Sequence, residues 1–340
     1  MLYIQPSLDD VDPLGNNNIA PQLFVINSDL DTVIIGKMGT LIWIDKNSFS
    51  DCNGNLVQGR IQVNLIEVLT THDMIMSNIQ TASNSEILES GGMINIDAFQ
   101  DGRNLCVVDS SVIGVLIPTN RAVKGMKLYR GDISNGMINW ENPIPILSDP
   151  QIIRKGVIPE EVLDIYGFDN VPFDSIDEVE WTIVPDSYNS VEFYDSLYAN
   201  LMAGYNAERQ LRFVFETNEF GWFNIDKLLQ TDKTESVNLQ IDIINRDVFQ
   251  TVFAKLVLVA EKSVVSGFES NKGTIVFNSA NNPAVYLPIE SNAVVIVTAY
   301  RNRKPYYSIK EFVISNEQNI EVELKKTMQK ELEGIINKVL

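Results

Sequence analysis

Apolar and polar residues alternate along many short segments of the chain. Ile61, Val63 and Leu65, for example, are separated by polar residues. This period of two places one face of a β-strand in a core and leaves the other face in solvent. The same segments are rich in β-branched and aromatic residues, which favour strands. In the first half of the chain the pattern predicts strands at residues 24–26, 32–35, 40–44, 60–68, 93–99, 104–108 and 112–117.

Turn residues separate these predicted strands. Asn53-Gly54 and Asp101-Gly102 supply the positive φ angles that tight β-hairpins require. Turns recur every 8 to 12 residues or so, roughly the spacing that is typical of β-sandwiches. We therefore predict a β-sandwich domain over residues 22–118, preceded by an extended arm at residues 1–21.

The second half of the chain predicts a further β-rich domain. Residues 119–177 are rich in proline and predict an ordered linker, with one helical candidate at 159–167. Residues 178–326 return to strand-like segments, with a helically spaced stretch at 190–210 after the first of them. The fold class is therefore mainly all-β, with two β-sandwich-like domains and a few short helices. The strand-like segments are 178–184, 211–217, 220–225, 237–243, 253–260, 273–279, 284–289, 293–300 and 306–314.

The chain ends on a predicted helix at residues 327–340. Its apolar residues recur at helical spacing and form one stripe. Such a stripe must be covered, either by its own domain or by a partner, so we expect it to take part in an interaction. The stripe consists of Met328, Leu332, Ile335, Ile336 and Val339.

Two adjacent glycines, Gly91 and Gly92, precede the strand-like run at 93–99. A phosphate-binding loop would need a helix after it, so that backbone N–H groups face the anion. Because a strand follows instead, we interpret the pair as architectural. It predicts a bend or β-bulge in which at least one glycine has a positive φ angle.

Composition narrows the function classes. The 340 residues carry a formal net charge of -19, which repels phosphate backbones and argues against nucleic-acid binding. No uninterrupted apolar run reaches the length of about 18 residues that a membrane helix needs. The first residues have neither the basic nor the apolar region of a signal peptide. The compartment stays open: the cell envelope or exterior if a signal was removed, otherwise a particle assembled in the cytoplasm.

Candidate catalytic chemistry is sparse. The one histidine, His72, follows a predicted strand and is best interpreted as a loop or edge residue, and no nucleotide, hydrolase-elbow or zinc-protease motif is present. Cys52 and Cys106 neither demand nor exclude a disulfide, and two structural thiols are the simpler interpretation. We expect no cofactor and no catalytic site.

A calcium ion is the most plausible metal. Residues 45–55 hold several oxygen donors, with Asp45, Asp51 and Asn53 as the candidate ligands. Their spacing does not fit an EF-hand loop, and an Asn-Gly hairpin with solvated carboxylates explains the same residues.

Aromatic residues suggest a possible glycan platform. The four tryptophans are the residues to examine, although Trp43 and Trp222 lie in predicted strands where core packing is the simpler role. Trp222 is expected to be largely buried in a strand of the second domain. The four are Trp43, Trp140, Trp181 and Trp222.

Residues 36–118 resemble a domain that is common in Bacteroidetes proteins. The shared parts, in order, are G-T-x-I, N-x-F, D-x-N-G, a G-x-[IV]-x-[IV] strand ending in Glu, L-E-[ST]-G-G-M and D-G-[KR]. That domain is similar to the β-sandwich through which ankyrins bind spectrin and which netrin receptors also contain. In the second half, FGWFNIDKLL at 220–229 resembles the G-W-[IF]-N-x-D strand that follows this domain in the same proteins.

This resemblance implies a fold and no catalytic residue, since members are surface or assembly proteins. Some relatives of the sandwich cut themselves at a His-Phe-Ser site, which this chain lacks, so self-cleavage is not expected. The leading hypothesis is a non-catalytic structural or adhesive subunit that binds other proteins or itself within a bacterial, phage or contractile-injection assembly. The alternatives are a carbohydrate-binding surface module and, third, an unrecognised hydrolase.

Overall fold

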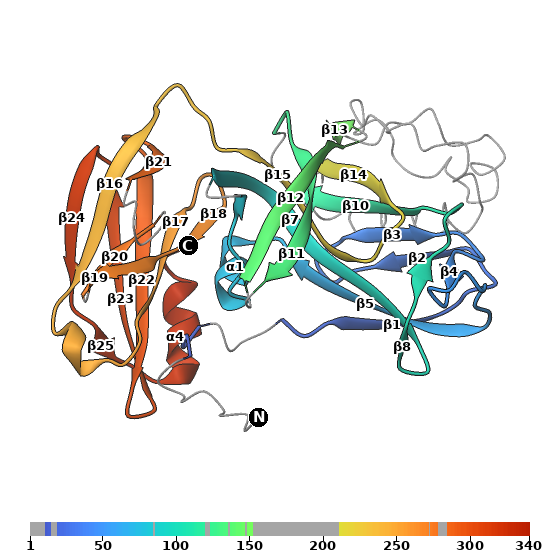
Figure 1. Cartoon of the computed structure of the whole chain (residues 1–340), viewed down its shortest axis with the longest axis horizontal. Coiled ribbons are helices and arrows are strands. Elements are labelled where there is room, and N and C mark those ends of the chain that lie inside the picture. Colours follow the sequence, from blue (N-terminus) through green and yellow to red (C-terminus); the bar gives the residue numbers. More distant parts are fainter. Residues whose placement is uncertain are drawn as a thin grey trace, which may run out of the picture.

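The computed structural model describes residues 11–14, 19–83, 86–119, 123–134, 137–146, 148–151, 211–271, 273–277 and 284–340. Within these residues the chain is mainly β, with several sheets and two short α-helices, one of them near the C-terminus (Figure 1). The predicted all-β fold is confirmed. Most of the arm, the helical candidates at 159–167 and 190–210, the strand at 178–184 and Trp181 lie outside the described residues.

The first sandwich consists of two sheets. The path of sheet 1 is β1 (Gln22–Asn27), β5 (Arg60–Val68), β7 (Glu86–Gln100), β15 (Gly221–Leu228), β11 (Lys127–Ser134) and β12 (Met137–Pro145); β6 (Ala82–Ser83) and β8 (Arg103–Asn104) also pair with β7. The order of sheet 2 is β13 (Ser148–Gln151), β14 (Leu211–Thr217), β10 (Ile113–Thr119), β3 (Leu41–Ile44) and β2 (Thr32–Ile35). A small ladder joins β4 (Phe49–Ser50) to β9 (Cys106–Val107).

The core of this sandwich forms from residues that alternate along the strands. Ile61, Val63 and Leu65 of β5 point into it, as the period of two predicted, and Phe213 and Phe215 of β14 face them from sheet 2. Burial of such side chains contributes about 1.5–3 kcal/mol each relative to full exposure. Hydrophobic burial between the two sheets is therefore a major source of stability for the first sandwich.

Two strands from beyond residue 210 belong to this first sandwich. β14 pairs with β10 and β13, and β15 inserts between β7 and β11. The sequence pattern instead predicts both segments in a domain at 178–326 and the hairpin of β11 and β12 in a linker. Alternation identifies a strand and its buried face, but it carries no information about the neighbouring strand.

The second sandwich lies entirely after residue 228. In sheet 3, β19 (Phe268–Asn271), β20 (Thr274–Val276), β16 (Thr234–Ile243) and β21 (Ala284–Pro288) pair in that order, and β24 (Glu317–Val322) pairs parallel to β16. Sheet 4 has the order β18 (Ser263–Ser266), β17 (Phe253–Leu258), β22 (Asn292–Arg301), β23 (Lys304–Val313) and β25 (Lys325–Lys326). Leu239, Ile241, Leu256 and Val295 are among the fully buried residues between the two sheets.

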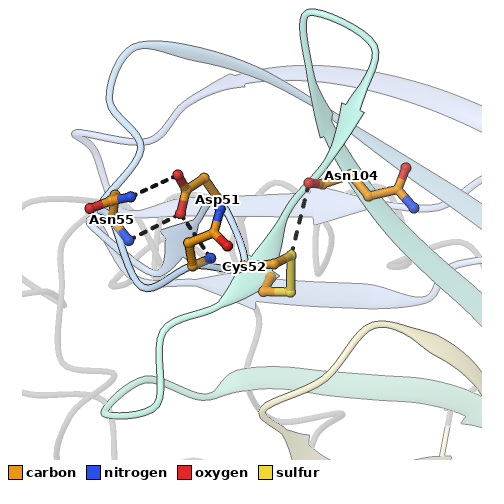
Figure 2. The surroundings of a disulfide bond; sticks show 6 residues. Asp51, Cys52, Asn55 and Asn104 are labelled. Carbon is orange, nitrogen blue, oxygen red and sulfur yellow. Dashed lines mark hydrogen bonds between the residues drawn. A yellow bond between two sulfur atoms is a disulfide. The ribbon is translucent and has the colours of Figure 1, made fainter.

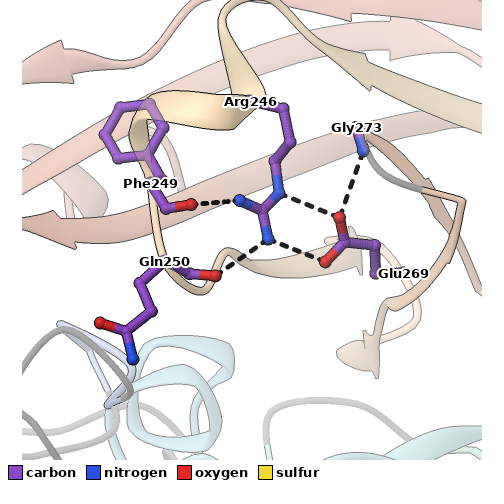
Figure 3. A network of polar contacts seen from close by, with 5 residues as sticks. All are labelled: Arg246, Phe249, Gln250, Glu269 and Gly273. Carbon is purple, nitrogen blue, oxygen red and sulfur yellow. Dashed lines mark hydrogen bonds and ion pairs between the residues drawn. The ribbon is translucent and has the colours of Figure 1, made fainter.

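A buried arginine, Arg246, forms a network of polar contacts in the second sandwich (Figure 3). Arg246 begins the short 3-10 helix η5 (Arg246–Val248), and its guanidinium forms a two-pronged ion pair with Glu269 at 3.0 and 2.9 Å. It also donates to the backbone carbonyls of Phe249 and Gln250. The same carboxylate accepts from the backbone N–H of Gly273, so one Arg–Glu pair joins η5 to the β19–β20 hairpin. The paired geometry suits arginine and carboxylate specifically.

A third core fills the space between the two sandwiches. It joins the outer face of sheet 1 to the outer face of sheet 4, and the helices α1 (Thr71–Met76) and α4 (Gln329–Ile336) pack into it (Figure 1). Its fully buried members include Met74, Ile75 and Trp140. A capping box formed by Thr70 and Asp73 starts α1. We call this group of residues the inter-sandwich core.

Hydrogen bonds also cross between the sandwiches. The backbone N–H of Thr81 donates to the carbonyl of Val264 at 2.8 Å, and the N–H of Val264 donates to the Thr81 hydroxyl at 2.9 Å. The Trp140 indole donates to the carbonyl of Gln80 at 2.8 Å, which fixes the segment that carries Thr81. Polar and apolar contacts therefore hold the two sandwiches together.

The chain itself covers much of the apolar stripe of the C-terminal helix. Leu332 and Ile336 are fully buried in the inter-sandwich core, where Leu14 of the arm also packs. The Gln329 side chain donates to the carbonyl of Pro13 at 2.7 Å and so attaches the arm to α4. Met328 is half exposed, while Ile335 and Val339 are partly buried. Leu332 and Ile336 are therefore not exposed for a partner.

We predict that Leu332→Ala destabilises the whole chain. Truncating a fully buried leucine removes its burial and leaves a cavity, which costs about 2–5 kcal/mol of unfolding free energy. The control is Met328→Ala, because Met328 is the N-cap residue of the same helix and is 50% exposed. Urea unfolding should show a clear loss for Leu332→Ala and a change within about 0.5 kcal/mol for the control. Equal, small losses would show that α4 is not part of the core.

Candidate functional site

The glycine pair lies inside one long strand, β7. Gly92 has a φ of +130°, and the pairing of β7 with β15 shifts between Gly92 and Ser90, which is the geometry of a β-bulge. A Cβ on Gly91 would lie 2.7 Å from the ring of Phe213, closer than atoms can approach without displacement. The bulge and the close contact with sheet 2 both require the absence of a side chain.

The bulge borders a cluster of buried polar side chains. Asn224 and Asp226, the N and D of the G-W-x-N-x-D segment, point to the same face of β15, and the Asn224 amide donates to the Asp226 carboxylate at 2.6 Å. The Ser90 hydroxyl donates to the Asn224 carbonyl at 3.4 Å and accepts from the N–H of Gly92. All three side chains are fully buried. Their mutual hydrogen bonds fix the three side chains on the face of sheet 1 that points toward the second sandwich, where solvent does not reach them.

Burial raises the pKa of Asp226 well above its ordinary value of 3.8. Hydrogen bonds from Ser90, Asn224 and the Gly91 backbone oppose this rise, and the charge of Glu89 adds to it. A carboxyl group in such a site favours the neutral, protonated form. With no solvent access it is a structural group and not a general acid that reaches a substrate.

Glu67 is the glutamate of the G-x-[IV]-x-[IV] strand motif and lies near the end of β5. Its side chain joins the two sheets of the first sandwich. Its buried carboxylate accepts hydrogen bonds from the backbone N–H of Met38 at 2.9 Å and of Thr40 at 3.0 Å. The Gln22 amide donates a third at 2.8 Å. Gly36 lies so close that a Cβ there would be 2.6 Å from the carboxylate. The turn between β2 and β3 is therefore held by a side chain from β5.

The calcium candidates do not converge on one site. The Asp51 carboxylate accepts from the backbone N–H of Asn53 and from the backbone and side chain of Asn55, at 2.9 to 3.1 Å (Figure 2). The Asn55 side-chain hydrogen bond is the main reason that the pKa of Asp51 is lowered. Asp45 instead accepts from the Trp43 indole at 2.5 Å. In the described part of the chain, no three His, Cys, Asp or Glu side chains gather as a metal site.

The two cysteines form a disulfide beside this hairpin (Figure 2). Cys52 and Cys106 are 54 positions apart, and the simpler interpretation as two free thiols is wrong. The hairpin carrying Cys52 and the segment of β9 carrying Cys106 are brought together by the β4–β9 ladder. Closing a loop of this length reduces the entropy of the unfolded chain, which in the entropic model contributes about 4 kcal/mol.

The remaining candidates lie in structural positions. His72 lies in α1, where its nearest ionic neighbour is Asp73 at 3.9 Å. Trp43 and Trp140 are buried, so neither forms an exposed aromatic platform. Trp222 is only partly buried, and it packs against the inter-sandwich core from a strand of the first sandwich instead of the second.

One cleft of about 310 Å³ opens at the end of the first sandwich, where β11 and β12 approach β14. Leu128 and Phe215 form its apolar floor, and Ile144 lies at its rim. Arg130 also lines the cleft, where its side chain donates to the Thr217 hydroxyl at 3.0 Å and forms an ion pair with Glu219 at 3.5 Å. Its guanidinium also stacks 4.4 Å from the Phe223 ring. These contacts with Thr217, Glu219 and Phe223 hold the Arg130 side chain in place as part of the cleft lining.

One edge strand, β1, exposes two apolar side chains. It ends sheet 1 and pairs only with β5 among the described strands. Leu23 and Val25 project from its outer face with 62% and 69% of their surface exposed, while Phe24 and Ile26 pack against the first core. Neither residue was singled out by the sequence. The edge status of β1 depends on long-range pairing, which the local pattern does not contain.

Comparison with known proteins adds no family to this picture. No protein-family model matches the chain, and no curated protein matches it. No helix among the described residues is long and apolar enough to cross a membrane.

We predict that Asp226→Asn flattens the pH dependence of stability. A raised folded-state pKa means that the folded chain holds a proton that the unfolded chain has released. The carboxyl group therefore lowers the unfolding free energy progressively as pH rises above 3.8 toward the folded-state pKa. The isosteric amide removes this term. Urea unfolding from about pH 5 to pH 8 should show a smaller decline for the variant. An unchanged decline would contradict the assignment.

Glu67→Gln is expected to weaken the first sandwich. The glutamine amide has one oxygen in place of two, so at least one of the three donors around Glu67 loses its acceptor. Leaving a buried donor unsatisfied costs about 1–3 kcal/mol. The control is Glu317→Gln on the exposed side of β24. Denaturant midpoints should separate the two variants, and equal midpoints would show that the Glu67 contacts contribute little.

Proposed function

We propose that this chain is a non-catalytic structural subunit that associates with a second copy of itself along strand β1. The observation that carries the proposal is the unprotected edge of sheet 1. An edge strand exposes unpaired backbone N–H and C=O groups and so offers a template for another strand. Leu23 and Val25 add apolar side chains that a second strand would cover.

The two edges of sheet 1 differ in their protection. β1 has six residues, QLFVIN, with no charged residue and no proline, and its ladder with β5 runs without a register shift. At the other edge, β12 contains Glu141, Pro143 and Pro145, and its pairing with β11 is interrupted. Charges, prolines and irregular pairing are the features that prevent edge-to-edge association. β12 has all of them and β1 has none.

The exposed residues of β1 are complementary to themselves. In an antiparallel pair, residues directly opposite one another project to the same face. In a two-fold symmetric pair centred on Phe24, Leu23 of each copy lies opposite Val25 of the other copy. Both exposed side chains are then covered, and sheet 1 continues across two molecules.

Several observations support a structural role over the alternatives. Glu67 and Asp226 are buried and hold strands together, and the cation of the described cleft is paired. Trp43 and Trp140 are buried, which does not favour a glycan platform. The resemblance of residues 36–118 to surface and assembly proteins agrees with a subunit of a bacterial or phage assembly. The disulfide favours an oxidising compartment, such as the cell envelope or exterior.

The test is the oligomeric state of the full chain and of Val25→Lys. We expect a dimer by sedimentation or light scattering, strengthened by salt because both copies carry a net charge of -19. Val25→Lys should raise the dissociation constant about tenfold or more, which corresponds to about 1.4 kcal/mol. The matched control is Val313→Lys, at another exposed strand position, which should leave the dimer unchanged.

Two results would overturn the proposal. The first is an intact chain that stays monomeric at high protein concentration and high salt. The second is a dimer that Val25→Lys leaves as strong as the control. In either case β1 is not the surface through which copies of this chain associate.

A further inference from the structure

A lysine is buried between the two sandwiches. Lys255 lies on β17, where its neighbours Ala254 and Leu256 point into the second core. Its own side chain points the other way, into the inter-sandwich core, and is 4% exposed. Burial lowers the pKa of Lys255, and the charge of Asp12 opposes this shift. A buried amine of this kind has a larger neutral, nucleophilic fraction than a lysine in water.

A carboxamide and a carboxylate meet this amine. The Nζ of Lys255 lies 2.5 Å from Oδ1 of Asn78 and 3.8 Å from Oδ2 of Asp12. The three residues come from distant parts of the chain: the arm, the turn after α1, and β17. Asn78 has a φ of +55°, so the turn itself directs this side chain toward sheet 4.

The Asp12 carboxylate is held in place through its other oxygen. Oδ1 accepts hydrogen bonds from the Thr298 hydroxyl at 2.8 Å and from the backbone N–H of Leu14 at 3.0 Å. Oδ2 is thereby directed at the lysine. Asp12 and Lys255 are 5% and 4% exposed, whereas Asn78 is an exposed residue of the turn.

We propose that Lys255 and Asn78 join in an intramolecular amide bond, with Asp12 as the proton carrier. The lone pair of the neutral Nζ attacks the side-chain carbonyl carbon of Asn78, and a new N–C bond forms. Asp12 takes one proton from the attacking nitrogen and delivers it to the carboxamide nitrogen. The C–N bond to that nitrogen breaks, ammonia leaves, and Asp12 returns to its initial form. No oxidant, reductant or cofactor is required.

The geometry brings the three groups of this reaction close together. The amine, the carbonyl and the proton carrier are fixed by the packing of three segments, which makes a slow bimolecular reaction intramolecular. Nζ donates a hydrogen bond to the Asn78 carbonyl oxygen, and attack requires the amine to turn its lone pair toward the carbon bonded to that oxygen. The product would link the first sandwich covalently to the second. The inference concerns chemistry within one chain and holds whatever that chain binds.

The direct test is the mass of the full chain. Purified protein is unfolded in guanidinium, its disulfide is reduced, and its intact mass is measured. We expect a mass lower than that of the sequence by one molecule of ammonia. Because cyclisation at an Asn-Gly pair removes the same mass, peptide mapping must then locate the loss. The expected product is one branched peptide joining Asn78 to Lys255, with trypsin unable to cut after Lys255.

Variants separate the chemistry from folding. Lys255→Arg and Asn78→Gly should each have the full mass of their sequences, and glycine tolerates the positive φ at position 78. Asp12→Asn keeps an acceptor for Thr298 and Leu14 but cannot carry the proton, so it should also keep its ammonia. The control is Lys233→Arg, at an exposed ion pair with Glu290, which should retain the branched peptide.

The wild-type measurement decides the proposal even where a variant fails to fold. Full mass in the folded wild-type chain, or loss of ammonia without a branched Asn78–Lys255 peptide, would overturn the bond. A branched peptide that persists in Asp12→Asn would overturn the role of Asp12.

Discussion

The central strands of sheet 1 are buried on both of their faces, and the rest of the structure depends on this constraint. One face packs against sheet 2, and the other packs, through the inter-sandwich core, against sheet 4. The central strand β7 is therefore buried along most of its 15 residues. In β15, Phe223 and Ile225 serve the first core while Asn224 and Asp226 lie under the second sandwich. The two sandwiches are thus halves of one packed body.

Burial on two faces explains why ionisable groups occur in the interior. A buried charge or polar group is costly unless a partner satisfies it, so each such group is tied to a particular neighbour. Glu67 binds the β2–β3 turn, Asp226 binds Asn224, and Lys255 contacts Asn78 and Asp12. The contacts of Glu67 and Lys255 join segments that are distant in the sequence, whereas the hydrogen bond between Asn224 and Asp226 lies within β15. These residue types occur in active sites, but here their geometry connects elements of the fold.

The same constraint indicates where contacts with other molecules can form. The centre of sheet 1 is covered on both faces, so its edges remain, where β12 has protective features and β1 has none. The sequence predicts the apolar stripe of the C-terminal helix as an interaction surface. In the structure, Leu332 and Ile336 of this stripe are instead buried in the inter-sandwich core. A covalent bond between Lys255 and Asn78 would act on that same core. It would keep the two sandwiches together under conditions that separate non-covalent contacts.

The sequence by itself determined the local features of this protein. Alternation located most of the described strands, Gly91-Gly92 marked a position where a side chain could not fit, and the apolar stripe after residue 327 predicted a helix. These features depend on neighbours within a few positions, so a periodic pattern encodes them.

Tertiary structure alone decided which strands pair, and it placed β14 and β15 in the first sandwich. It also decided that Cys52 meets Cys106, that α4 is covered from within, and that β1 lies at an edge. Each of these outcomes requires contact between residues far apart in the chain. A period of two specifies which face of a strand is buried but not what buries it.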